Sequence, residues 1–70
     1  MKIDSSLTNR IVTIKINDRD DNGKKIWNKF VFIAGKCTFA GINPITKEIQ
    51  ITIDRTPYFP LVESDLVNVE

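Results

Sequence analysis

Histidine is absent from this sequence of 70 residues, and cysteine occurs only once. These two counts exclude a zinc finger, a histidine-based catalytic triad and an intramolecular disulfide. The longest uncharged stretch is far shorter than the roughly 20 apolar residues that a membrane-spanning helix needs. Ten basic and nine acidic side chains give a net charge of +1, so the overall charge favours neither nucleic acid nor a membrane surface.

The composition favours β-structure. Ile, Val, Thr, Phe, Tyr and Trp total 28 residues, whereas Ala, Leu, Met and Glu total nine. β-branched and aromatic side chains fit a pleated, half-buried strand and lose rotamer freedom in a helix. The length fits one small domain, residues 1–70, with little room for a catalytic cleft. Residues 1–9 precede the first alternating segment and are expected to form a flexible N-terminal segment.

Alternation of apolar and polar residues predicts five short strands. We expect them at residues 10–17, 26–34, 37–42, 48–55 and 67–69. Val12, Ile14 and Ile16 would face inward from the first strand, and three isoleucines at 49, 51 and 53 from the fourth.

Turn residues separate these segments. Asn22-Gly23 predicts a hairpin between the first two strands, since Asn-Gly is a strong hairpin signal. Gly35-Lys36 is expected to end the second strand, and residues 55–60, with two prolines, to form a rigid loop. Ser64-Asp65 predicts a short 3₁₀ turn before the last strand.

The order of these elements resembles the SH3-like small barrels, which include SH3, Tudor and KOW-type modules. The features that carry the resemblance are the hairpin Phe30–Ile42, the strand Ile49–Ile53, the turn Glu63–Leu66 and the closing strand Val67–Val69. It covers roughly residues 10–70 and rests on the strand pattern. The resemblance implies an all-β, five-stranded barrel, and it transfers no binding residues. An OB-like barrel also fits the strand count.

The segment Arg55–Pro60 is the best candidate for a binding surface. Its prolines fix the backbone, so presenting Arg55, Tyr58 and Phe59 to a partner would cost little entropy. Arginine and large aromatic side chains are enriched at protein–protein hot spots. Trp27 is a candidate second anchor. The structural alternative is that Phe59 closes one end of the core.

Lysines are concentrated in the middle of the chain. Residues 24–47 carry five lysines and no acid, whereas residues 48–70 have a net charge of −4. Four of these lysines, Lys24, Lys25, Lys29 and Lys36, follow the predicted hairpin near Trp27. Basic groups beside an aromatic ring are typical of single-strand binding, so a nucleic-acid-binding hairpin is the alternative to a protein-binding module. A solvated lysine face is the simpler interpretation.

Two further motifs are better explained by structural roles than by a metal site or a reactive group. Asp18 to Gly23 fits the first half of a calcium loop, but Lys29 occupies the position of the essential glutamate. A polar turn therefore accounts for it, and no metal site is expected. Cys37 has no histidine or second cysteine to activate it, so we expect a buried small side chain.

These observations favour a non-catalytic module that acts through protein–protein contact, with no cofactor and no enzymatic activity. The apolar stretch Phe30–Ile33 adds a homodimer as a further option. Abundant Ile, Lys and Asn are typical of AT-rich genomes, which suggests a phage or mobile-element protein that binds a host factor. The N-terminus lacks a secretory signal, and we expect a cytoplasmic location.

Overall fold

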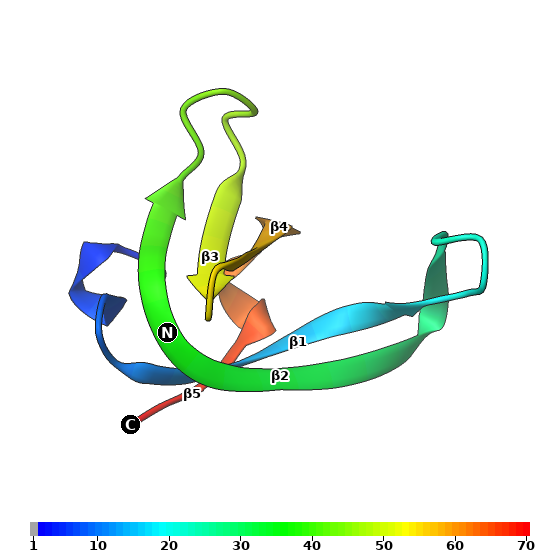
Figure 1. Ribbon diagram of the computed structural model, residues 1–70, viewed down its shortest axis with the longest axis horizontal. Helices are drawn as coiled ribbons and strands as arrows, with labels where there is room; N and C mark the ends of the chain where they lie inside the picture. The colour runs from blue at the N-terminus through cyan, green and yellow to red at the C-terminus, as the bar shows by residue number, and fades with distance from the viewer. Residues whose placement is uncertain (1) are drawn as a thin grey trace.

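The computed structural model describes residues 2–70, whose strands form one antiparallel sheet (Figure 1). The elements are η1 (Ser5–Leu7), β1 (Ile11–Arg19), β2 (Lys25–Ile42), β3 (Ile49–Ile53), β4 (Thr56–Leu61), η2 (Glu63–Asp65) and β5 (Leu66–Val69). The strand order is β4-β3-β2-β1-β5. The predicted all-β class, with five strands and a 3₁₀ turn before the last, is confirmed. None of the helices in residues 2–70 has the length and apolar character that crossing a membrane requires.

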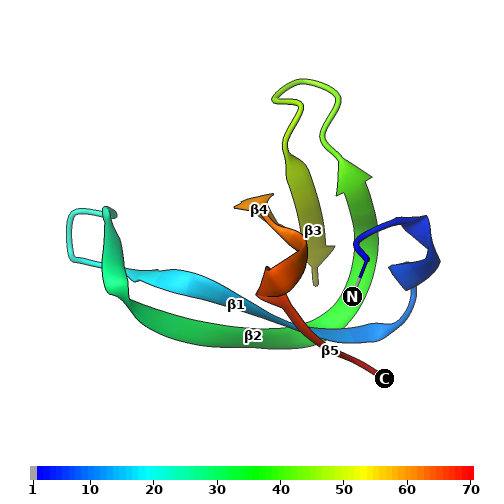
Figure 2. The ribbon, with the colours of Figure 1, turned by 180° about the vertical axis from the view of Figure 1, so that it is seen from behind.

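A single strand, β2, replaces the two strands predicted at 26–34 and 37–42. It is 18 residues long, pairing with β1 up to Lys36 and with β3 from Cys37 onward. Figures 1 and 2 show β2 curving from the β1 hairpin into the β3 hairpin. The predicted break at Gly35-Lys36 is therefore wrong. A Cβ on Gly35 would lie 2.6 Å from Ile53 Cγ2, so glycine here permits a close approach within a continuous strand.

The segment predicted as a rigid loop at residues 55–60 is instead strand β4. Its partner is β3, with Ile53 opposite Thr56 and Ile51 opposite Tyr58. Asp54 and Arg55 form the connecting two-residue turn with φ of 48° and 74°, as the tight hairpin turns require. The prolines are tolerated because β4 is an edge strand. The predicted number of strands is thus right. The predicted break at residues 35–36 and the predicted loop at residues 55–60 are wrong.

The sheet bends over itself without closing into the expected barrel. Its two edges are β4 and β5, which are not hydrogen-bonded neighbours in residues 2–70. β5 is short and pairs only with Val12, Thr13 and Ile14 of β1. Within residues 2–70, the rest of β1, from Lys15 to Arg19, therefore pairs with a strand on one side only, that of β2, and β1 also contacts η2.

The core lies between the two layers that the bend of β2 creates. Its buried members are Ile3, Leu7, Val12, Ile14, Cys37, Ala40, Ile51, Ile53, Leu61 and Leu66. The predicted inward positions Val12, Ile14, Ile51 and Ile53 are confirmed, because all four are almost fully excluded from solvent. Within the described residues, no polar or charged side chain is buried.

Two residues of the N-terminal segment that was expected to be flexible, Ile3 and Leu7, pack against the core. Ile3 and Leu7 are buried, and the Asn9 N–H donates to the Cys37 carbonyl at 2.7 Å. Asp4 caps η1 by accepting from the Ser6 N–H at 3.0 Å. The Ser6 hydroxyl also donates to this carboxylate, and together these hydrogen bonds lower the pKa of Asp4.

The far end of the β1–β2 hairpin projects away from the core (Figures 1 and 2). We call residues 17–30 the hairpin arm, and none of them is buried. The predicted turn at Asn22-Gly23 forms its tip, where Gly23 has a φ of +80°. One carboxylate oxygen of Asp20 accepts from the N–H groups of Asn22 and Lys24, both at 2.9 Å. The tip is therefore ordered by its own polar groups.

Candidate functional site

An open pocket of about 280 Å³ lies between the hairpin and β4. Its lining comprises Lys15, Ile16, Asn17, Arg19, Lys25 and Phe30 from the hairpin, the six residues of β4, and Asp65 of η2. The volume is close to the roughly 300 Å³ at which ligand clefts begin. The pocket exists because the hairpin extends past the end of β5, leaving a gap between β1 and β4.

The β4 wall of the pocket is apolar and aromatic. Pairing with Ile51 fixes Tyr58, which is half-buried and packs against the core. Phe59 is 38% exposed, and Pro57 and Pro60 flank the two aromatic residues. A peptide bond in the cis form joins Phe59 to Pro60. Aromatic rings held beside prolines on a paired strand form a firm contact surface.

The hairpin wall is basic. Lys15, Arg19 and Lys25 supply three cations, and Asp65 is the single acid in the lining. The Asp65 carboxylate already accepts from the Val62 N–H at 3.1 Å. The Lys15 ammonium lies 4.9 Å from the centre of the Phe30 ring, in a cation–π contact. The pocket therefore joins an apolar wall to a wall with an excess of positive charge.

Two of the four residues proposed for protein binding line the pocket, and the other two lie outside it. Tyr58 and Phe59 line the pocket, whereas Arg55 lies in the β3–β4 turn outside the lining. Trp27 lies on the hairpin arm with 83% of its surface exposed, also outside the lining. Phe59 neither closes the core nor stands free, since it is partly exposed in the pocket wall.

Sequence reasoning missed two of the three cations of the basic wall. Lys15 and Arg19 belong to a regularly alternating strand, where outward-facing polar residues are the rule. Only the projection of the hairpin opposite β4 brings them near the aromatic residues. No signal in the local sequence marks this juxtaposition, because it depends on where β5 ends.

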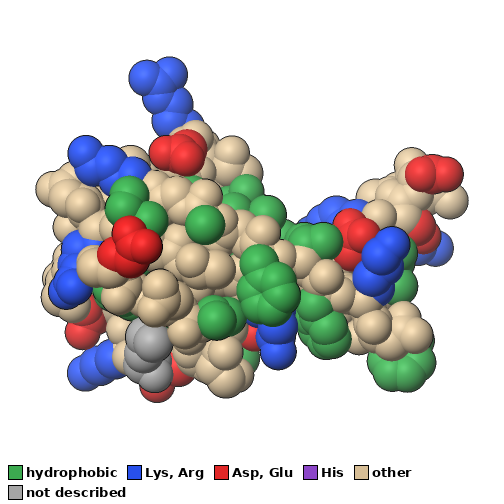
Figure 3. Space-filling view, turned by 90° about the horizontal axis from the view of Figure 1, so that it is seen from below, with side chains coloured by type: hydrophobic (Ala, Val, Ile, Leu, Met, Phe, Trp, Pro, Cys, Tyr) green, Lys and Arg blue, Asp and Glu red, His purple; other side chains and the backbone are tan. Residues whose placement is uncertain are grey.

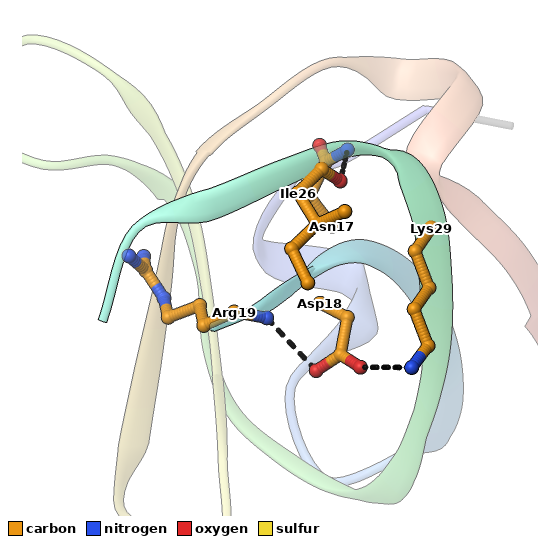
Figure 4. Close-up of polar contacts among 5 residues, drawn as sticks. All are labelled: Asn17, Asp18, Arg19, Ile26 and Lys29. Carbon is orange, nitrogen blue, oxygen red and sulfur yellow. Dashed lines mark hydrogen bonds and ion pairs between the residues drawn. The ribbon is translucent and has the colours of Figure 1, made fainter. Parts of the chain in front are cut away.

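The four lysines proposed for nucleic-acid binding do not form one stripe. Lys24, Lys25 and Lys29 lie on the hairpin arm, whereas Lys36 lies at the bend, opposite Ile11. At about 3.3 Å per strand residue, Lys36 lies roughly 23 Å along β2 from Lys29. The Lys29 ammonium pairs with the Asp18 carboxylate at 3.5 Å (Figure 4). Of the four, only Lys25 lines the pocket.

Apolar side chains also gather on the convex face of the hairpin (Figure 3). Phe32 lies opposite Lys15, and Phe30 opposite Asn17, so all four side chains share the face that Ile14 and Ile16 do not occupy. Lys15, Asn17 and Phe30 also contribute to the lining of the pocket. Phe32 is 64% exposed and Phe30 is 49% exposed. In the predicted apolar stretch Phe30–Ile33, one face is therefore directed inward. The two phenylalanines on the other face are partly exposed to solvent.

The polar motif at Asp18 to Gly23 and the lone thiol have structural roles. Residues 2–70 contain no group of three or more acidic or cysteine side chains able to hold a metal ion. Asp18 accepts from the Arg19 N–H at 2.8 Å, and Figure 4 shows both of its contacts. Cys37 is fully buried, as predicted, and this burial raises the pKa of its thiol.

No protein-family model matches the chain, and no match is found among curated proteins or solved structures. The geometry of the pocket, the convex face and the sheet edges therefore carries the functional argument.

Proposed function

We propose that this chain is a non-catalytic binding module that acts through protein–protein contact at the pocket between the hairpin and β4. The observation that supports this function most is the partly exposed Phe59 beside Tyr58, in a wall stiffened by Pro57 and Pro60. Large aromatic residues in a concave, ordered site are typical anchors of protein partners. Arg55 and Trp27 remain proposed outer contacts, since both are exposed.

The strand connections support an SH3-like assignment as part of this proposal. β1 pairs with both β2 and β5, the bent β2 contributes to both layers, and η2 precedes the last strand. Small open barrels with this arrangement serve as recognition modules. The assignment rests on topology and carries over no binding residues.

Nucleic acid is the second candidate partner. Lys15, Arg19 and Lys25 stand near Phe30 and Tyr58 in one pocket, which is the combination that single strands use for backbone contact and base stacking. Of the lysines predicted for this function, Lys24, Lys29 and Lys36 would contribute only from outside the pocket. This candidate requires binding that weakens steeply with salt.

A second copy of the chain is a further proposed protein partner. Phe30 and Phe32 would lie at the centre of such a contact, on the convex face of the hairpin. Covering these rings would add apolar burial to a small core. Sedimentation velocity over a range of protein concentrations tests this option, and Phe32→Ser should shift any dimer to monomer.

The proposal retains the context suggested by the sequence. A host factor of a low-GC bacterium is the proposed partner, and the cytoplasm is the proposed location. The single cysteine, Cys37, is buried and free, as is common in a reducing compartment. No cofactor and no catalytic step are part of the proposed function.

A capture experiment tests the function. The immobilised protein would be mixed with lysate of a low-GC bacterium, with and without nuclease, at two salt concentrations. Phe59→Ala and Tyr58→Ala remove the aromatic anchors. Ile45→Ala is the matched control, because Ile45 is 88% exposed and lies outside the pocket lining.

We expect one stoichiometric protein that withstands nuclease and moderate salt. Phe59→Ala should weaken its capture by at least about tenfold, in the range of a hot-spot residue, while Ile45→Ala should retain it. Loss of capture after nuclease treatment would instead favour the nucleic-acid candidate. Equal capture by wild type and both aromatic variants would refute the pocket as the binding site.

A further inference from the structure

The hairpin side of the pocket is an unpaired edge of the sheet. β5 pairs with β1 only as far as Ile14, so the edge of β1 from Lys15 to Arg19 borders the pocket. An unpaired edge presents a row of main-chain N–H and C=O groups that can pair with another chain. The pocket therefore offers main-chain hydrogen bonds as well as side-chain contacts.

The main-chain groups of Lys15 and Asn17 point toward the pocket. The Ile11 carbonyl accepts from the Glu70 N–H at 2.9 Å, on the side of β1 that faces β5. Both main-chain groups of a strand residue point to the same side, and the side alternates along the strand. The β1–β2 register is continuous from Ile11 to Asn17, so residues 15 and 17 point the same way as residue 11.

The opposite side of the pocket does not offer such an edge. Ile53 and Thr56 flank a two-residue turn and form the hydrogen-bonded pair of that hairpin. The next residue, Pro57, therefore points its nitrogen away from β3, toward the free side of β4, and this nitrogen carries no hydrogen. The register shift before Leu61 interrupts β4 further. An added strand would consequently pair with β1 rather than with β4.

The side chains beside the β1 edge define the chemistry of an added strand. Lys15 lies on the convex face and Ile16 on the concave face, where Tyr58 and Phe59 form the facing wall. With Arg19 and Lys25, the site has three cations against the single acid Asp65. A strand that alternates acidic and apolar residues would place acids beside the cations and apolar groups beside the aromatic wall.

We propose that the pocket binds an extended acidic peptide segment, which adds as a strand to the free edge of β1 at Lys15 and Asn17. This inference rests on the proposed protein-binding function and names the partner's chemistry and its mode of binding. The peptide exchanges main-chain hydrogen bonds with residues 15 and 17. Its apolar side chains contact Tyr58 and Phe59, and its acidic side chains face Lys15 and Arg19.

The test uses the whole chain and a blocked hexapeptide of sequence Glu-Val-Glu-Val-Glu-Val. Binding would be followed by amide NMR spectra and by hydrogen exchange of Lys15 and Asn17. Two further peptides carry N-methyl groups, one on the valine amides and one on the glutamate amides. A Lys-Val peptide of the same length and oligo-dT provide the comparisons for charge and for nucleic acid.

We expect the Glu-Val peptide to slow exchange of the Lys15 and Asn17 amides. One of the two methylated peptides should bind normally and the other at least about tenfold more weakly, since only one set of amides faces β1. Indifference to both methylations, or unchanged exchange at Lys15 and Asn17 on binding, would overturn strand addition. Tighter binding of oligo-dT or of the Lys-Val peptide would overturn the acidic peptide.

Variants at Lys15 separate charge from main-chain pairing. Lys15→Gln removes the charge and should weaken peptide binding by about threefold, as expected for one partly exposed ion pair. Lys15→Pro also removes the outward N–H and should weaken binding by at least a further threefold. If this proline prevents folding, the methylated peptides still decide the mode of binding with the wild-type chain.

The two proposals fail in different ways. If Phe59→Ala releases a captured protein but the peptide neither binds nor protects residues 15 and 17, the protein-binding site stands and strand addition is wrong. If no protein is captured through the aromatic residues, the proposed function itself is wrong, whatever the peptide does. Peptide binding that is insensitive to Phe59→Ala would confine the site to the β1 edge and contradict the aromatic contact.

Discussion

Gly35 shows how one residue shapes the bend of β2. A Cβ at this position would lie 2.6 Å from both Ile53 Cγ2 and Asp54 Oδ2. The Asp54 carboxylate can turn aside, but Ile53 is buried and β-branched, so its side chain has little freedom to move. The two layers can therefore approach closely only where β2 lacks a side chain.

We expect Gly35→Ala to lower the free energy of unfolding by about 1–3 kcal/mol, the usual cost of overpacking. Urea denaturation at neutral pH would measure this change. Gly23→Ala is the comparison, because a Cβ there meets no atom within 4 Å and only the φ of +80° opposes it. Stability of Gly35→Ala equal to that of wild type would contradict close packing at the bend.

Cys37 gives the core a defined response to alkaline pH. Burial raises the pKa of its thiol above the ordinary value of 9.0, although hydrogen bonding with the backbone of Phe39 opposes the shift. The unfolded thiol therefore loses its proton first as the pH rises. The stabilisation is fully present below pH 9.0 and is lost as the pH rises from there through the folded pKa.

The prediction is that the free energy of unfolding falls more steeply above pH 9.0 in the wild type than in Cys37→Ala. Urea denaturation of both proteins at several alkaline pH values measures the difference in slope, which cancels the contributions of the other titrating groups. Parallel slopes would show that the thiol is accessible in the folded protein.

At the scale of elements, the hairpin arm is the least supported part of the sheet. No residue from 17 to 30 is buried, and the arm is held by pairing within the hairpin and by local polar contacts. One such contact is the Asn17 amide, which donates to the Ile26 carbonyl at 3.1 Å. The strands near the core, in contrast, carry fully buried residues such as Ile14 and Ile51.

We expect amides of the arm to exchange with solvent through local opening, at a much lower free energy than those of Ile14 and Ile51. Asp20→Ala removes the acceptor of two tip hydrogen bonds and should speed exchange around Asn22 and Lys24. Global stability should change by less than about 1 kcal/mol, since the tip lies outside the core. Native-state hydrogen exchange measures both effects, and uniform protection along β1 and β2 would argue against a separate arm.

At the scale of the whole molecule, one small core supports both layers. Ile51 is fully buried at its centre, whereas Ile45 is 88% exposed in the β2–β3 loop. For a domain of this size, the total stability is roughly 4–10 kcal/mol, and a single core cavity removes a large part of it. The two isoleucines therefore make a matched pair of the same residue type.

Ile51→Ala should cost about 2–5 kcal/mol, and Ile45→Ala less than about 0.5 kcal/mol. Thermal and urea unfolding would measure both. Fluorescence of the arm residue Trp27 and far-ultraviolet circular dichroism should report one transition in the wild type if the arm unfolds with the core, and two if it opens separately. Equal costs for the two isoleucines would contradict the assignment of the core.

The class of the fold and the inner faces of its most regular strands follow from the amino-acid sequence alone. Val12, Ile14, Ile51 and Ile53 alternate with polar residues, and a two-residue period admits only one buried face. Asn22-Gly23 likewise located the hairpin tip, because its turn conformation depends on local residues alone. Local rules were sufficient wherever the structure depends on neighbours along the chain.

The bend of β2, the two edges of the sheet and the pocket depend instead on contacts between distant parts of the chain. Judged from the local sequence, Gly35 and the two prolines of β4 would each interrupt a strand. In the structure, Gly35 permits close packing, and the prolines lie on an edge strand. The lysine and arginine of β1 line the same pocket as the aromatic residues of β4, because β5 ends early and the sheet stays open. These residues lie about 40 positions apart in the sequence, and no local pattern links them.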